Sequence, residues 1–219
     1  MGPSVDVPAG RLSDPTLELR DASGGLITSN DNWRDSPDRA EIESAGLAPE
    51  DDREAVVVRT LAPGQYTALV AGKDATSGIG LVEIYDRTAN SASVLANIST
   101  RGSVRTDDNV LIGGFIAGNQ SGDARIMVRG IGPSLRDQVA GALEDPVLEL
   151  RDADGALITS NDNWKDDQQS EIEATGIPPR DDAEAAIIRS LSPALYTAIL
   201  RGKDDTSGIA LVEIYRLSE

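Results

Sequence analysis

The chain of 219 residues contains no cysteine and no histidine. The absence of cysteine excludes disulfides and thiolate metal sites, and the absence of histidine removes the commonest zinc ligand and the commonest general base. Basic residues are also scarce, since 20 lysines and arginines face 37 aspartates and glutamates, for a net charge of −17. This charge would repel nucleic acid and anionic membranes, so we expect neither as a partner and expect cations as ligands.

Long apolar runs are absent too. No stretch approaches the roughly 20 apolar residues that span a bilayer, so we expect no membrane insertion. The start, Met1-Gly2-Pro3-Ser4, lacks the basic and apolar layout of a signal peptide, so we expect no export signal within these residues.

What the sequence does contain is an internal repeat. The stretch LITSNDNW occurs twice without change, at residues 26–33 and 157–164, and LVEIY recurs at residues 81–85 and 211–215. The offset between the copies is 131 residues before a short insertion and 130 after it. Two copies of one structural unit therefore fill most of the chain.

Each copy reads as β structure. Leu17 and Leu19 alternate with charged residues, which is the period of a half-buried strand, and turn residues separate five such stretches per copy, at 16–20, 26–29, 54–60, 65–71 and 79–85 in the first. A short helix is expected at 36–46 and again at 166–176. The predicted fold class is all-β, with jelly-roll-like antiparallel β-sandwich units in tandem and one short helix per unit.

The middle of the chain has no counterpart in the first copy. It contains three further apolar stretches, at 94–100, 109–117 and 124–131, and a small polar linker is expected at 87–93. We predict an N-terminally truncated repeat at 1–90 and a complete repeat at 91–219. Two arrangements remain open, because the middle strands either complete the second repeat or serve both.

The first residues point to a repeat that begins part-way through. GPSVDVPAGRLSDP at residues 2–15 resembles residues 132–146 with one residue missing. We expect a piece of a longer tandem array, or a reading frame that begins at an internal boundary. The truncated repeat would then have an open edge, which favours strand exchange or a homodimer.

Polar clusters after the second strand are the main candidate site. Asparagine and aspartate oxygens are hard ligands of the kind that calcium prefers. The spacing does not match an EF-hand, and an Asx-turn that ends a strand is the structural alternative. Nearby carboxylates such as Glu54 and Glu184 could close the site or lie on a solvated charged face. The predicted Ca²⁺ ligands are Asn30, Asp31, Asn32, Asp35, Asn161, Asp162, Asn163 and Asp166.

Other motifs offer less chemistry. Trp33 and Trp164 follow the polar clusters and could stack on a sugar ring, although a tryptophan in this position more often covers a core. The glycine-rich stretch at 78–80 leads into a strand and not a helix, unlike a nucleotide-binding loop. A hydrolase built on two carboxylates stays open because acidic residues are plentiful. No catalytic residue is predicted.

The order of these elements resembles the bacterial pre-peptidase C-terminal domain and related β-sandwich repeats. The resemblance is carried by Leu17-x-Leu19-x-Asp21-x-x-Gly24, by 30–32, by Pro63-Gly64-x-Tyr66 and by 78–85, and it covers roughly residues 12–86 and 143–216. The second copy departs from it with Ala194-Leu195 in place of Gly64-Gln65. The resemblance implies a jelly-roll-like sandwich, export, and a non-catalytic accessory role, sometimes with bound calcium.

Together these observations predict a structural or adhesive module of a bacterial secreted or surface protein, stabilised by calcium and without catalytic residues. Its expected location is extracellular or at the cell surface, with an extracellular protein or glycan as ligand. The alternatives are a metal-dependent hydrolase whose carboxylates hold the ion, and a carbohydrate-binding module.

Overall fold

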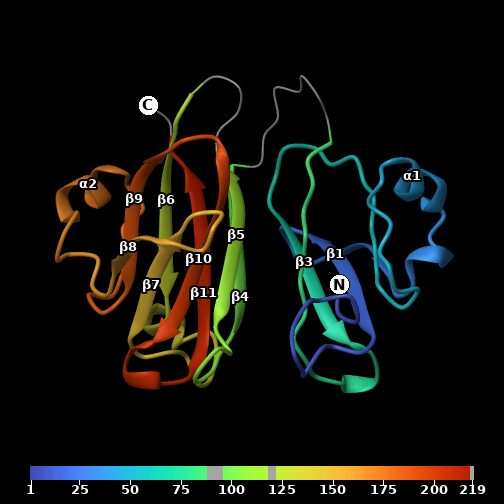
Figure 1. Ribbon diagram of the computed structural model, residues 1–219, viewed down its shortest axis with the longest axis horizontal. Coiled ribbons are helices and arrows are strands. Elements are labelled where there is room, and N and C mark those ends of the chain that lie inside the picture. The colour runs from blue at the N-terminus through green and yellow to red at the C-terminus, as the bar shows by residue number, and fades with distance from the viewer. Residues whose placement is uncertain (88–95, 118–121, 218–219) are drawn as a thin grey trace. The chain divides into compact units, whose positions relative to one another are not determined.

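The computed structural model describes residues 1–87, 96–117 and 122–217 (Figure 1). The chain divides into two compact units, Met1–Val94 and Leu95–Glu219. We call these the first and the second unit. The linker expected at 87–93 lies almost entirely outside the described residues.

The second unit contains two antiparallel four-stranded sheets, ordered β5-β10-β7-β8 and β4-β11-β6-β9 (Figure 1). Alternation of apolar and polar residues gives β7 one buried face, as its pattern of buried and half-buried residues shows, whereas β6 is buried on both faces over most of its length. The strands are β4 (Asn97–Val104), β5 (Leu111–Ala117), β6 (Ala124–Ile131), β7 (Pro146–Arg151), β8 (Leu157–Asn161), β9 (Ala185–Leu191), β10 (Ala194–Gly202) and β11 (Gly208–Arg216).

The core of the second unit lies between these sheets. Leu148 and Leu200 from one sheet join Val128 and Val212 from the other in a single buried cluster. A smaller cluster on the other side of β6 includes Ile172 of the short helix α2 (Gln169–Ala174). Burial of two facing apolar surfaces is what holds a sandwich together, and the all-β prediction is confirmed.

The three middle strands belong to the second unit. β4 and β6 both pair with β11, β6 also pairs with β9, and β5 pairs with β10. The pairing answers the question left open by the sequence, because all of these partners lie in the second copy.

The first unit contains less regular structure. It has one three-stranded sheet, ordered β2-β1-β3, and a helix, α1 (Arg39–Ser44). Its strands are β1 (Pro15–Asp21), β2 (Leu26–Asn30) and β3 (Tyr66–Gly72), the counterparts of β7, β8 and β10.

Two strands predicted for the first unit are wrong. Residues 54–60 and 79–85 form no strand, whereas their counterparts in the second unit are β9 and β11. The physical reason is the pairing partner that each strand needs. In the second unit β6 lies between β9 and β11 and bonds to both, and a strand is defined by its ladder as much as by its alternating residues.

Candidate functional site

The predicted calcium ligands follow β2 in the first unit and β8 in the second. Asn30 and Asn161 close the strand end: each Nδ2 donates to the carbonyl of the residue two positions on at 3.0 Å. Each Oδ1 accepts the backbone N–H of Val56 or Ala186 at 2.9 Å. Both ends of each amide are therefore occupied in joining the strand end to the segment that follows the helix.

Asn32 and Asp35, with Asn163 and Asp166 in the second unit, form a separate group. The Nδ2 of each asparagine donates to the aspartate Oδ2, at 3.3 Å and 3.0 Å. The aspartate N–H returns a bond to the asparagine carbonyl in both copies. The backbone bond is that of a tight turn, which in the first unit is the 3-10 turn η1 (Trp33–Asp35), and not of the Asx-turn that the sequence offered as the structural alternative, in which a side-chain oxygen would accept the N–H.

Asp31 and Asp162 point elsewhere, toward a lysine. Asp31 lies 2.5 Å from the ammonium of Lys73, and Asp162 lies 2.6 Å from that of Lys203. Each lysine starts a 3-10 turn, η2 (Lys73–Ala75) or η4 (Lys203–Asp205), in which the following aspartate adopts a positive φ. The hydrogen bond to the aspartate raises the pKa of both lysines.

A second aspartate in each copy, which the site prediction missed, completes this arrangement. Asp14 lies 3.8 Å from Lys73, and Asp145 lies 3.4 Å from Lys203. Burial, followed by the negative charge of Asp162, raises the pKa of Asp145. We call Asp14, Asp31 and Lys73 the first carboxylate pair with its lysine, and Asp145, Asp162 and Lys203 the second.

The inner oxygens of these pairs are not satisfied. The Oδ1 atoms of all four aspartates are buried and have no hydrogen-bond partner within the described chain. Buried carboxylate oxygens normally have a donor or a cation beside them. At the same time, residues 1–87, 96–117 and 122–217 contain no group of three or more acidic, histidine or cysteine side chains placed to hold a metal. The eight predicted ligands are thus divided among three local networks in each copy.

Glu54 and Glu184 are fully buried, which contradicts the solvated face offered for them. The carboxylate of Glu184 accepts the N–H groups of Gly132 and Ser134 at 3.2 Å and 2.9 Å, and the Ser134 hydroxyl at 2.9 Å. Glu54 makes the same three contacts with Gly2 and Ser4. Their sequence signal was the recurrence of Gly-Pro-Ser at a fixed distance before the glutamate.

The tryptophans cover the core. Trp33 is 2% exposed and Trp164 is 5% exposed, and Trp164 packs against Met127 and Ile172. A cation also lies over each ring, Arg34 over Trp33 and Lys165 over Trp164. Rings buried to this degree offer no face on which a sugar could stack.

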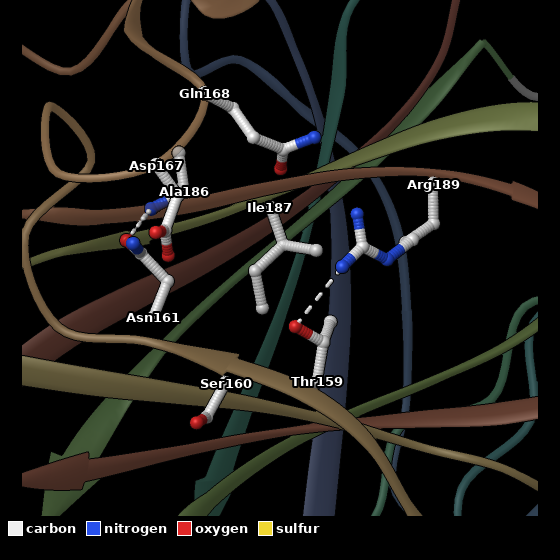
Figure 2. A pocket seen from close by; sticks show the side chains of 8 residues that line it. All are labelled: Thr159, Ser160, Asn161, Asp167, Gln168, Ala186, Ile187 and Arg189. Carbon is white, nitrogen blue, oxygen red and sulfur yellow. Dashed lines mark hydrogen bonds between the residues drawn. The ribbon is translucent and has the colours of Figure 1, made fainter.

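A pocket of about 310 Å³ opens between β8 and β9 in the second unit (Figure 2). Arg189 donates to the Thr159 hydroxyl at 3.2 Å, and Asn161 closes the other side through its bond to Ala186. The same place in the first unit is nearly filled, with about 20 Å³, because Arg59 there binds Asp38 at 2.8 Å. In the second unit Gln168 stands at the position of Asp38 and lines the pocket. Its amide bonds to the backbone of Ile188 and not to the arginine.

None of the helices within the described residues has the length and apolar character needed to span a bilayer.

The chain is similar to several solved structures. One is the pre-peptidase C-terminal domain of collagenase from Bacillus anthracis, with 9% identity, a TM-score of 0.35, and coverage of 54% of this chain and 89% of that one. Another is the VP2 subviral particle of infectious bursal disease virus, with 12% identity, a TM-score of 0.20, and coverage of 97% and 60%. No family model matches the chain, and no curated protein matches it. The assignment of the second unit as a β-sandwich rests on its strand pairing.

Proposed function

We propose that this chain is a non-catalytic structural or adhesive β-sandwich module of a bacterial secreted or surface protein. The observation that carries the proposal is that the same polar contacts recur within each of the two copies. Asn30 and Asn161, Glu54 and Glu184, and Lys73 and Lys203 each bond to matching partners at nearly equal distances. Side chains committed to holding loops in place in both copies serve the scaffold and are not free to react with a substrate.

The location can be tested in the bacterium that produces the protein. Antibody raised against the chain should label intact cells or should capture the chain from the medium. Protease added to intact cells should degrade the cell-bound fraction of the chain. Labelling that appears only after lysis would contradict the proposal. A panel of ester, phosphoester and glycoside substrates, tested with and without divalent metal, separates the module from the alternative of a metal-dependent hydrolase.

Calcium is the proposed stabilising ion, and Asp31 and Asp162 are the predicted ligands that best support it. Each has a buried Oδ1 atom that finds no hydrogen-bond partner among the described residues, and a second aspartate lies beside the same lysine. A calcium ion would compete there with the lysine ammonium, since both need the same oxygens. An ion that binds only the folded unit stabilises it by about 2.7 kcal/mol at a hundredfold excess over its dissociation constant.

Thermal melting with calcium, with magnesium and with chelator tests this assignment. We expect Asp162→Asn to lose the calcium-dependent rise in Tm. Lys203→Met removes the competing ammonium, so we expect it to lower Tm in chelator and to increase the rise produced by calcium. Asp182→Asn, on an exposed carboxylate, is the matched control. Overlapping melting curves for the unmodified chain with calcium and with chelator would remove the ion from the account.

The proposed partner is an extracellular protein, bound through the edge of the first unit's sheet at β3, beside which the described residues place no further strand. Burial of Trp33 and Trp164 supports a protein over a glycan as the ligand, because it removes the aromatic faces that sugars require. A homodimer through the same edge is the competing arrangement.

A further inference from the structure

The pocket of the second unit lies between β8 and β9, which are edge strands of the two sheets (Figure 2). Its volume of about 310 Å³ falls at the lower end of the range of roughly 300–1,000 Å³ found for small-ligand sites. The lining is mainly polar and includes the hydroxyl residues Thr159 and Ser160 and the cationic Arg189. The pocket therefore has the size and the chemistry for a small polar ligand.

The first unit shows which chemical group fits this place. Its counterpart of the pocket is lined by Thr28, Ser29 and Arg59 at the matching positions and has a volume of only about 20 Å³. There the guanidinium of Arg59 donates to the Asp38 carboxylate at 2.8 Å and to the Thr28 hydroxyl at 2.9 Å. A carboxylate of the chain itself is thus the partner of the arginine in the first unit.

The arginine of the second unit is held in the same way but lacks that carboxylate. Arg189 donates to the Thr159 hydroxyl at 3.2 Å and to the Ile188 carbonyl at 3.3 Å, matching the bonds that Arg59 makes to the equivalent hydroxyl and carbonyl. Among the residues that the structure describes, no carboxylate pairs with Arg189. A guanidinium has five N–H groups, so donors remain for a further acceptor in the pocket.

Two differences between the copies explain why the pocket is open in the second unit. Gln168 stands where the first unit has Asp38, and its amide bonds to both backbone groups of Ile188. Ala186 stands where the first unit has Val56, which removes two carbon atoms from the wall. The second unit therefore keeps the arginine and its support while lacking the internal carboxylate and part of the wall.

We propose that the second unit binds the carboxylate group of an external ligand in this pocket, with Arg189 as the charged donor and Thr159 as the positioning residue that holds the guanidinium. The carboxylate takes the place that Asp38 has in the first unit and accepts charge-assisted hydrogen bonds. Asp167 lines the same pocket on the side away from Arg189 (Figure 2), so it would repel a second negative charge. The ligand is therefore a monocarboxylate, either a free small molecule or an acidic side chain of a protein.

An NMR titration of the full, isotope-labelled chain with propionate tests the proposal. We expect saturable shifts of the backbone amides at residues 159–161 and 186–189, and none at 28–30 and 56–59, because Asp38 already pairs with Arg59 there. Propionamide has the same shape without the charge and should bind at least about tenfold more weakly. Sodium chloride at equal ionic strength should not reproduce the shifts.

Variants at one position separate the charge from the amide of Gln168. Gln168→Asp copies the first unit, so its carboxylate should pair with Arg189 and weaken propionate at least about tenfold. Gln168→Ala removes the same amide without adding a charge, so it should bind propionate as the parent does. Arg189→Met should abolish the saturable shifts, whereas Arg125→Met, which removes an equal charge from an exposed pair, should leave them unchanged.

Two further probes define the ligand. Succinate should bind more weakly than propionate because Asp167 faces its second carboxylate, and tighter binding of succinate would refute the assignment as a monocarboxylate. A capped tripeptide with one aspartate between two glycines identifies the source. Competition of this peptide with propionate indicates a protein side chain, and lack of competition indicates a free small carboxylate.

Three outcomes would overturn the proposal. They are the absence of saturable shifts with propionate, equal shifts with propionamide, and binding that persists in Arg189→Met or in Gln168→Asp. The pocket is separate from the aspartates proposed to bind calcium, and none of these outcomes bears on the calcium titration or on the labelling of intact cells. Failure of this inference and failure of the proposed function are therefore distinguishable.

Discussion

Glu184 offers the sharpest test of how the second unit is held together. Its side chain is 0% exposed, and its carboxylate accepts five hydrogen bonds, of which four come from backbone N–H groups. Two of these groups, in Gly132 and Ser134, belong to the turn that follows β6, and two belong to the turn before β9. The carboxylate therefore ties the turn after β6 to the turn that starts β9.

Removal of the carboxylate leaves donors without acceptors. Glu184→Ala leaves four buried N–H groups without an acceptor. Breaking a buried charged network of this kind lowers the free energy of unfolding by about 3–5 kcal/mol. For a unit of this size that corresponds to a fall in Tm of about 10–20 °C.

Glu184→Gln separates hydrogen bonding from packing. The glutamine keeps the shape of the side chain but replaces one acceptor oxygen with an NH₂ donor, which would face two or three donors of the turn. We therefore expect the glutamine variant to lose about 2–4 kcal/mol, nearly as much as alanine. Glu173→Gln, on the exposed face of α2, is the matched control and should stay within about 0.5 kcal/mol of the parent.

Denaturant unfolding followed by tryptophan fluorescence provides the measurement. In a Trp33→Phe background Trp164 alone reports on the second unit, since its indole is buried and will become solvated on unfolding. A glutamine variant as stable as the parent, beside a destabilised alanine variant, would refute the hydrogen-bond account and assign the role of Glu184 to packing.

Two further outcomes are expected. Because burial and Asp162 raise the pKa of Asp145, the folded state binds that proton more tightly than the unfolded chain does, so ionised Asp145 costs stability at neutral pH and the cost disappears as pH falls below the ordinary aspartate pKa. Asp145→Asn should thus raise Tm at pH 7, with a difference from the parent that vanishes in acid; a lower Tm at pH 7 would contradict this. Arg129→Met should cost about 3–5 kcal/mol because it leaves Glu213 buried without its partner, whereas Arg125→Met, in an exposed pair, should cost less than about 1 kcal/mol, and Glu213→Gln added to Arg129→Met should restore part of the loss in denaturant titrations.

Strands flanked by turn residues were predictable from local pattern. Leu17 and Leu19, or Leu148 and Leu150, alternate with charged residues, and this period fixes a strand with one buried face whatever its neighbours are. The short helices were predictable for a similar reason, since Ile42 and Ile172 supply a single apolar anchor between polar residues and a glycine follows each helix.

The candidate site was predictable only in part. Sequence alone identified Asp31 and Asp162 as residues of interest, but it grouped them with their asparagine neighbours because those are adjacent in the chain. Their contacts are instead with Lys73 and Lys203, which lie 42 and 41 positions further along the chain. Distance along the chain carries no information about such pairs, because they meet only when β2, β1 and β3, or β8, β7 and β10, align side by side.

The sequence by itself determined the repeat, the strand period, the acidic surface and the absence of cysteine and histidine chemistry, because each of these is a property of local order or composition. Only the tertiary structure decided that identical stretches have different fates. LVEIY is a buried strand at 211–215 and an exposed segment without a ladder at 81–85, since β6 lies beside one copy and not beside the other. Backbone groups and apolar side chains become a strand when a neighbour satisfies them, and among the residues that the structure describes only the second copy has that neighbour.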